Sequence, residues 1–363
     1  MLDIKFIRDN TKIVREELKK RGMHFDMDAF LELDTQRRKL VQVLDESRAK
    51  QNEVSDKITN LAGDERTHMI EEMKKLKEYI STQEKERVDI EKEWNAQLLY
   101  LPNISHESVP VGSDESGNVV VKTWGEPRQF DFKPLEHYQI PSVQPYLDME
   151  RGAKIAGNRF WYLKGPLAQL EMGLMQYAMH FFSDKGFIPM ITPMLVREEA
   201  LWGTGFFPAD KNEIYTVNKD EDNLYLVGTA EVPLAGYYMD ETIDLSDGPQ
   251  KFVGYSSCFR REAGAYGKDM KGMLRGHQFN KAEMFIFCSE EDSWPMHEFL
   301  RECAESFMQS LNLPYRVLNM CTGDIGAPNA KKYDIETWMP GQGQYRETNS
   351  CSNDTEFQAR RLN

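Results

Sequence analysis

Charged and aromatic residues concentrate in one stretch of the sequence, where two strand-like segments flank a loop. The first segment ends with Arg260, Arg261 and Glu262, and the second carries Phe279 and Glu283. Strand alternation predicts Arg260 and Glu262 on one face and Arg261 on the other. A guanidinium donates paired hydrogen bonds to a phosphate, a ring stacks on a base, and a carboxylate accepts from an ammonium or hydroxyl. These residue types suit a nucleotide bound beside an amino compound.

The loop between these strands, residues 264–276, holds four glycines and three basic residues, Lys268, Lys271 and Arg275. Glycine permits many backbone conformations, so we expect a flexible, cationic loop. The return strand is expected to present four side chains on one face: His277, Phe279, Lys281 and Glu283. An exposed charged hairpin with internal ion pairs would have the same composition. The hairpin alone therefore leaves both interpretations open.

Two other segments place polar residues where a site could use them. Thr229 and Glu231 come directly after an apolar strand expected at 224–228. Glu347 and Ser350 lie three apart in the run YRETNSCSN. This pair suits a Mg²⁺ ion that also binds phosphate, because Mg²⁺ takes one or two carboxylates and keeps phosphate oxygens and waters. Each segment is a weak signal by itself.

Motif searches and composition narrow the class of protein. The sequence contains no phosphate-binding GxxxxGK[ST] loop, no GxGxxG, no HExxH and no paired CxxC. Its five cysteines favour a reducing compartment over a disulfide scaffold. The first residues lack the apolar run of a signal peptide, and no apolar stretch is long enough for a membrane span. We therefore expect a cytoplasmic protein with no membrane contact.

The net charge of −14 is unevenly distributed. Residues 1–100 hold 20 basic and 22 acidic residues, whereas the remainder holds 25 and 37. Composition therefore does not favour a polyanionic partner, and any such contact would need local basic patches.

Residues from about 35 to 100 have the pattern of a long antiparallel helix pair. Apolar residues recur at heptad spacing from Leu40 to Ile58 and again from Met69 to Trp94, with Ala62-Gly63-Asp64 as the break. A break this short requires the second helix to fold back on the first. A dimerising coiled coil or a spacer would give the same pattern, so the arm alone does not indicate function.

The remaining sequence predicts an α+β fold. Residues 1–102 are expected to form the helical N-terminal domain that carries the arm, 103–135 a linker, and 136–363 a second domain. Most predicted strands of that domain follow one another without an intervening helix, which favours an antiparallel sheet with flanking helices. The expected helices are 166–185 and 292–311, and the expected strands are 119–123, 224–228, 252–262, 276–287, 314–320, 333–338 and 344–350.

The ordered set of motifs resembles one family, the seryl-tRNA synthetases of the ordinary bacterial and eukaryotic type, which are class II aminoacyl-tRNA synthetases. The likeness runs from the first helix through the arm to the last residue. It is carried by GTAEVP, CFRREAG, HQFNKAE, CTGD and SCSNDTEFQARR, in that order. The resemblance implies a class II antiparallel catalytic domain and a serine–tRNA ligase.

The resemblance implies roles for the residues that match these motifs. Thr229, Ala230 and Glu231 would hold the serine ammonium, and Glu283 the serine side chain. Arg260 would bridge the α-phosphate and the serine carboxylate, and with Glu262 it would form the catalytic pair. The remaining ATP contacts would come from Arg261, Phe279, Glu347, Thr348, Asn349 and Ser350, with Glu347 and Ser350 also on Mg²⁺.

The same resemblance implies partners. The arm would bind tRNA(Ser), with tRNA(Sec) as a second candidate, and the loop at 264–276 would enter the acceptor end. Phe187 to Pro193 would belong to a homodimer interface. The family departs from this sequence in two ways: Asn349 stands where a serine is usual, and the family continues beyond the position of Asn363 into a third conserved motif. The sequence as printed is therefore expected to adenylate serine weakly or not at all.

Two alternatives compete with this interpretation. A related ligase that loads a carrier protein would lack the arm at 35–100. A non-catalytic relative that binds tRNA or another partner through its arm would keep the arm and dispense with the missing motif.

Overall fold

A computed structural model describes residues 1–58, 62–218, 221–263 and 271–363. The chain divides into two compact units. One comprises Leu2–Lys19 and Met23–Leu101, and the other comprises Met1, Lys20–Gly22 and Pro102–Asn363. No helix in the described parts of the chain is both long and apolar enough to cross a membrane.

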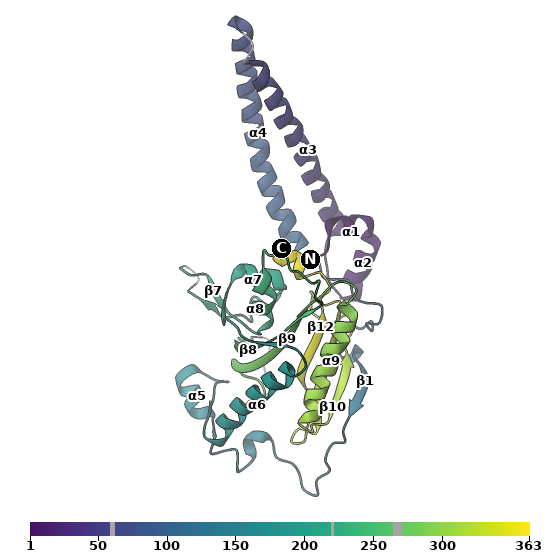
Figure 1. The fold of residues 1–363 in the computed structure, drawn as a ribbon, viewed down its shortest axis with the longest axis vertical. Helices are drawn as coiled ribbons and strands as arrows, with labels where there is room; N and C mark the ends of the chain where they lie inside the picture. The colour runs from purple at the N-terminus through teal and green to yellow at the C-terminus, as the bar shows by residue number, and fades with distance from the viewer. Residues whose placement is uncertain (59–61, 219–220, 264–270) are drawn as a thin grey trace. The chain divides into compact units, whose positions relative to one another are not determined.

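The smaller unit contains the predicted helix pair. Its helices are α1 (Ile4–Asp9), α2 (Thr11–Lys20), α3 (Met27–Ile58) and α4 (Gly63–Leu98). α3 and α4 lie side by side along their length (Figure 1), and an ion pair between Arg48 and Glu84 at 2.9 Å joins them. The prediction of the pair is confirmed, although α3 begins at Met27, before the expected start near residue 35.

The heptad pattern locates the contact between these two helices. Leu40, Leu44, Met73 and Ile80 are buried. Polar seam positions such as Gln51 are half-buried rather than exposed. Nearer α1, the buried Asp34 pairs with three arginines: Arg8 at 2.7 Å, Arg38 at 3.3 Å and Arg37 at 3.6 Å. Apolar contacts and this ion cluster together hold the unit.

The larger unit is built on two main sheets. The first has the order β1-β10-β11-β12 and is antiparallel throughout, and the second has the order β4-β8-β9. β8 and β9 pair antiparallel, whereas β4 runs parallel to β8, a local departure from the expected antiparallel sheet. Their bounds are β1 (Val119–Trp124), β4 (Ile188–Ile191), β8 (Gln250–Phe259), β9 (Gln278–Phe287), β10 (Tyr315–Asn319), β11 (Lys331–Met339) and β12 (Gln344–Asn353).

Shorter elements complete this unit. Its helices are α5 (Met149–Ala156), α6 (Pro166–Ser183), α7 (Glu198–Thr204), α8 (Glu231–Ala235), α9 (Ser293–Ser310) and α10 (Ala359–Leu362). Its small sheets pair β2 (Leu147–Asp148) with β3 (Tyr162–Leu163), and β7 (Leu224–Leu226) with both β5 (Leu195–Arg197) and β6 (Thr216–Val217). The predicted α+β class is therefore confirmed. The segment 103–135, expected as a linker, supplies β1 to the first main sheet.

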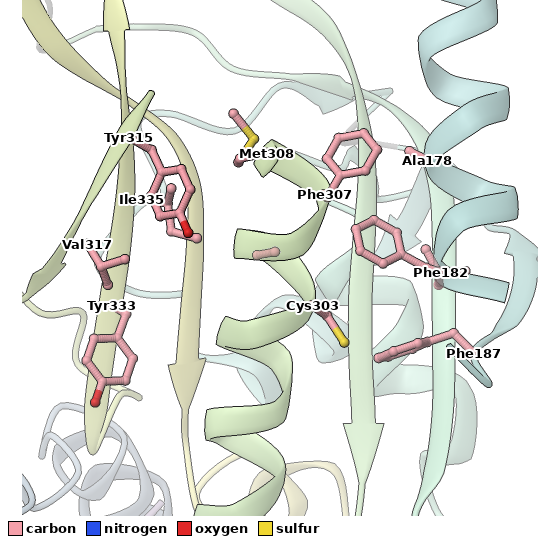
Figure 2. Packing of buried hydrophobic residues seen from close by; sticks show 12 residues of the cluster. Ala178, Phe182, Phe187, Cys303, Phe307, Met308, Tyr315, Val317, Tyr333 and Ile335 are labelled. Carbon is pink, nitrogen blue, oxygen red and sulfur yellow. The ribbon is translucent and has the colours of Figure 1, made fainter. Parts of the chain in front are cut away.

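The core of the larger unit lies around α9. α9 lies between the core residues of β10 and β11 on one side and Phe182 and Phe187 on the other, and its Cys303 and Phe307 face Phe182 and Phe187 (Figure 2). Ile335 of β11 points into this core. Successive residues of a strand point to opposite faces, so the core residues fix which side chains face away from it.

That alternation decides where the polar residues go. Ala282 and Met284 of β9 pack on the core, so Lys281 and Glu283 lie on the other face. By the same rule Asp334 of β11 faces away from the core. The polar residues of β9 and β11 thus lie on the sheet faces that α9 does not cover.

Candidate active site

The first strand of the charged hairpin ends earlier than the sequence suggested. β8 ends at Phe259, which pairs with Gln278. The backbone N–H of Phe259 donates to Val227 at 2.8 Å, and that of Arg261 donates to Glu213 at 2.8 Å. Glu262 has φ of 51°, outside the extended region. The expectation of a strand that runs to Glu262 is therefore wrong, although the N–H of Arg260 still donates to the carbonyl of His277 at 3.0 Å.

Arg260 and Phe279 lie close together. Nε of Arg260 donates to the carbonyl of Gly228 at 3.2 Å, and its Cζ lies 5.3 Å from the centroid of the Phe279 ring. The arginine is thus held between the residue before Thr229 and the aromatic side chain of β9. Its guanidinium is presented beside a ring face, as a triphosphate and its base would require.

Glu262 is bound to the far side of the loop. Its carboxylate pairs with Nε of Arg275, so the two ends of the 264–276 segment are joined. Residues 264–270, which carry most of the expected tRNA loop, lie outside the described residues. Within the rest of that segment, the backbone N–H of Met273 donates to Nε2 of His137 at 2.8 Å.

The residues expected around serine form a connected set. The hydroxyl of Thr229 donates to Oε2 of Glu283 at 2.7 Å. Nζ of Lys281 lies 2.5 Å from the same Oε2 and 3.0 Å from the Thr229 hydroxyl. Thr229 is 2% exposed, so β7, its following turn and β9 bring these groups together in a largely dry environment.

Glu231 occupies a different electrostatic environment. Its Oε1 accepts from Nε2 of Gln358 at 2.7 Å, and its backbone N–H donates to the Thr229 hydroxyl at 3.2 Å. Burial, followed by the charges of Asp354 and Glu283, raises the pKa of Glu231 to about 7. Ala230 is completely buried, so it contributes its backbone alone.

A β-bulge brings Glu347 and Ser350 to one face. Residues three apart on a regular strand point to opposite faces. Here Ser350 pairs with Asp334 and Glu347 pairs with Glu336, with Thr348 as the extra residue between them. Asp334 and Glu336 are two apart on β11, so their partners share a face. Glu347 and Ser350 are both exposed, as ligands for a cation and a phosphate would have to be.

The side chains of Thr348 and Asn349, which were also expected to contact ATP, do not share the face of β12 that carries Glu347 and Ser350. Asn349 pairs with Ile335, whose side chain is in the core, so Asn349 lies on the face opposite Glu347. The Thr348 hydroxyl lies 2.8 Å from that of Thr337. The structure thus does not bring Thr348 and Asn349 together with the Glu347–Ser350 pair.

Asp334 and Lys332, which no sequence motif indicated, adjoin that pair. Nζ of Lys332 lies 3.0 Å from Oδ1 of Asp334. Burial raises the pKa of Asp334 to about 6, with the charge of Lys332 acting in the opposite direction and that of Glu347 adding to the rise. In the described parts of the chain, no group of three or more His, Cys, Asp or Glu side chains is arranged to hold a metal.

Two contacts of the serine set were also missed. Lys281 was expected only to share a face with Glu283, yet it touches both Glu283 and Thr229. Gln358 was given no role, although it lies in the motif that carried the resemblance. Gln358 and Glu231 are far apart in the sequence, so no local pattern indicates their contact. It forms only when α10 folds against α7.

Both ends of the chain match known protein families. The model described as the seryl-tRNA synthetase N-terminal domain matches residues 1–105, and that of the tRNA synthetase class II core domain (G, H, P, S and T) matches residues 215–363. The serine–tRNA ligase of Dictyoglomus turgidum is 44% identical, and the alignment covers 100% of this chain and 86% of that protein.

Solved structures agree with the sequence matches. Seryl-tRNA synthetase from Pyrococcus horikoshii, complexed with ATP, has a TM-score of 0.91 and 39% identity over 100% of this chain and 86% of its own. Cytoplasmic serine–tRNA ligase from Naegleria fowleri, in complex with AMP, has a TM-score of 0.87 and 34% identity over 100% of this chain and 85% of its own. The chain therefore belongs to the seryl-tRNA synthetase family of class II aminoacyl-tRNA synthetases.

Proposed function

We propose that this protein is a serine–tRNA ligase, which joins serine to ATP as seryl-adenylate and transfers the seryl group to tRNA(Ser). The observation that carries the proposal is the contact set of Thr229, Glu283, Arg260 and Phe279, which combines a hydroxyl and a carboxylate in contact with a guanidinium beside an aromatic ring. A relative that is 44% identical over the whole chain bears the name serine–tRNA ligase.

Serine would bind with its two polar ends on different carboxylates. Glu231 and the Thr229 hydroxyl would hold the ammonium, and Glu283 would accept from the serine hydroxyl. Alanine would leave Glu283 without that donor. Unpaired buried polar groups cost on the order of 1–3 kcal/mol, so this arrangement favours serine.

ATP would bind beside Phe279 and Arg260. The ring would stack on the base, and Glu262 would release Arg275 to contact the base edge. The P. horikoshii relative was crystallised with ATP, which supports the nucleotide class. Glu347 and Ser350 share an exposed face and would hold Mg²⁺ together with the phosphates, where the ion would neutralise phosphate charge.

The chain's own part in the reaction is alignment and charge stabilisation. A serine carboxylate oxygen attacks the α-phosphorus, and pyrophosphate leaves. Arg260 would contact both the carboxylate and the α-phosphate, and so would offset the charge that accumulates as the bond forms. A hydroxyl at the tRNA 3′ end then takes the seryl group and AMP leaves. No covalent enzyme intermediate is needed.

The remaining parts of the proposal concern partners. The α3–α4 pair would bind tRNA(Ser) by backbone and shape, since its surface is nearly neutral in charge. A second copy of the chain would cover α6 and β4, where apolar side chains are exposed: Leu170 at 65%, Met172 at 73%, Ile188 at 57% and Ile191 at 87%. Five free cysteines fit a reducing compartment such as the cytoplasm.

Serine-dependent pyrophosphate–ATP exchange tests the proposal. The assay is run on this chain and on one extended by the C-terminal residues of its relatives. Exchange with serine and not with alanine or threonine is expected, and Arg260→Ala should reduce it by at least about a thousandfold, in line with the loss of a charge-stabilising donor. No exchange from the extended chain, or exchange with another amino acid, would overturn the assignment in favour of the binding-only alternative or another ligase.

A further inference from the structure

Lys281 places a cation inside the set of groups proposed for serine. Its Nζ lies 2.5 Å from Oε2 of Glu283 and 3.0 Å from the hydroxyl of Thr229. The Lys281 side chain is 31% exposed and that of Glu283 is 17% exposed, so the ion pair is partly shielded from water. It therefore differs from a fully solvated surface pair, which contributes little.

The ion pair uses one oxygen of Glu283. Both Thr229 and Lys281 contact Oε2. Among the residues that the structure describes, none donates a hydrogen bond to Oε1 of Glu283. A carboxylate oxygen accepts more than one hydrogen bond, and the second oxygen is left for a ligand. Glu283 is thus charge-neutralised by Lys281 but retains an acceptor.

Within the ranges that the structure describes, the second carboxylate has no cation in contact: Lys281 acts on Glu231 only through its charge at a distance, which lowers the pKa of that carboxyl against the larger effect of burial. Oε1 of Glu231 accepts from the neutral amide of Gln358 at 2.7 Å, and no ion pair within 4 Å is found for it among the described residues. The environment therefore makes the two acids unequal: Glu283 has a cationic partner in contact, and Glu231 has a neutral one. Two carboxylates in different environments commonly take different roles.

We propose that Lys281 is a specificity-determining residue, which reserves Glu283 for the neutral hydroxyl of the substrate side chain and leaves Glu231 for the α-ammonium. This inference rests on the proposed serine activation. It predicts that the site rejects amino acids whose side chain carries an ammonium, because Lys281 already occupies that position and would repel a second cation.

The test compares serine with 2,3-diaminopropionate, which has an amine in place of the serine hydroxyl. Binding to the chain is measured by calorimetry, and exchange kinetics are measured in parallel, at mildly acidic pH where both amines carry a proton. The variants are Lys281→Met, which removes the charge at similar length, and Lys281→Arg, which keeps it. Lys164→Met is the matched control, because Lys164 pairs with Asp148 at 3.1 Å outside the site.

The expected result is a change in the ratio of the two affinities. Lys281→Met should shift the ratio toward 2,3-diaminopropionate by about tenfold or more, since a charge-assisted hydrogen bond replaces a neutral one. Lys281→Arg and Lys164→Met should keep the wild-type preference. An unchanged ratio in Lys281→Met, or a uniform gain in serine affinity, would overturn the inference. A wild-type chain that binds no serine would instead contradict the proposed function.

Discussion

Gln358 donates one amide hydrogen to Oε1 of Glu231 at 2.7 Å and another to the carbonyl of Thr204 at 3.2 Å. The residue is 7% exposed, so water does not readily replace either bond. One side chain next to α10 thereby fixes the carboxylate at the start of α8 relative to the end of α7. The proposed ammonium partner is oriented by a residue more than a hundred positions away in the sequence.

Replacing Gln358 with alanine should weaken serine binding selectively. The change leaves a half-buried carboxylate without its donor and free to rotate, which costs on the order of 1–3 kcal/mol. We expect the KM for serine to rise about tenfold in exchange assays of the C-terminally extended chain, with the KM for ATP unchanged. Gln309→Ala is the control, because Gln309 donates to Tyr315 at 2.8 Å in the α9 core. Equal effects on both substrates would indicate a general loss of structure instead.

Serine affinity should depend on pH through Glu231. Burial and the charges of Asp354 and Glu283 raise its pKa to about 7, and only the ionised form can pair with an ammonium. The KM for serine should therefore rise as the pH falls below about 7, approaching tenfold per pH unit. The stability of the fold depends on pH in the opposite direction. Because the pKa of Glu231 is raised in the folded state, protonation favours folding, and this contribution is lost as the pH rises through about 7.

The variant Glu231→Gln isolates that effect. It cannot ionise, so its KM for serine should be high and should not change across the same pH range. The measurement is the KM of exchange at several pH values, with the KM for ATP as the internal reference. A wild-type profile that is flat between pH 5.5 and 8 would contradict the role of Glu231.

Sequence patterns predicted the elements better than the details of the site. The heptad spacing predicted α3 and α4 correctly because the same row of apolar residues forms the contact between the two helices. The strand expected to run to Glu262 ends at Phe259: Arg260 still donates to the carbonyl of His277 at 3.0 Å, but the N–H of Arg261 donates to the carbonyl of Glu213 instead. Glu213 is distant in sequence, so no local pattern records it.

The candidate site shows the same limit. Alternation would have separated Glu347 from Ser350, and only the bulge at Thr348 returns them to one face. Lys281 belongs to the motif HQFNKAE, but its contact with Thr229 depends on the turn after β7, which the motif does not indicate. The resemblance of the motifs implied the roles of the site residues. The ion pair that distinguishes Glu283 from Glu231 is visible only in the three-dimensional structure.

Asp34 should be a determinant of stability in the smaller unit. Burial opposes its ionisation, but hydrogen bonding and charge from Arg8, with Arg37 and Arg38, lower its pKa overall. Asp34→Asn should lower the free energy of unfolding by about 2–3 kcal/mol, because it leaves three guanidinium groups without their anion. Thermal and urea unfolding followed by circular dichroism would measure it.

An exposed ion pair in the same unit supplies the control for Asp34. Asp28 lies 2.5 Å from Arg15, but the two side chains are 84% and 41% exposed. Asp28→Asn should change stability by less than about 0.5 kcal/mol. The Asp34 contribution should also be lost as the pH falls through its lowered pKa. Equal effects of the two substitutions would show that burial does not matter here.

Glu347 should set the Mg²⁺ requirement of exchange. Glu347→Gln keeps the shape of the side chain and the pairing of β12 with β11, but it removes the negative charge that a divalent ion prefers. We expect the Mg²⁺ concentration for half-maximal exchange to rise about tenfold, with serine binding unchanged. Glu356→Gln is the control, since Glu356 is exposed and pairs with Arg360. An unchanged Mg²⁺ titration would remove Glu347 from the proposed metal site.

Shortening the helix pair should separate the two half-reactions. Arg48 and Glu84 face each other at 2.9 Å, so residues 53–79 can be replaced by a short glycine-rich turn beyond that level without breaking the pair. Exchange does not use tRNA and should stay within about twofold of the full chain. Charging of tRNA(Ser) should fall by about a hundredfold or more, because the distal contacts to its phosphate backbone are gone. Charging that survives the deletion would contradict the tRNA-binding role of α3 and α4.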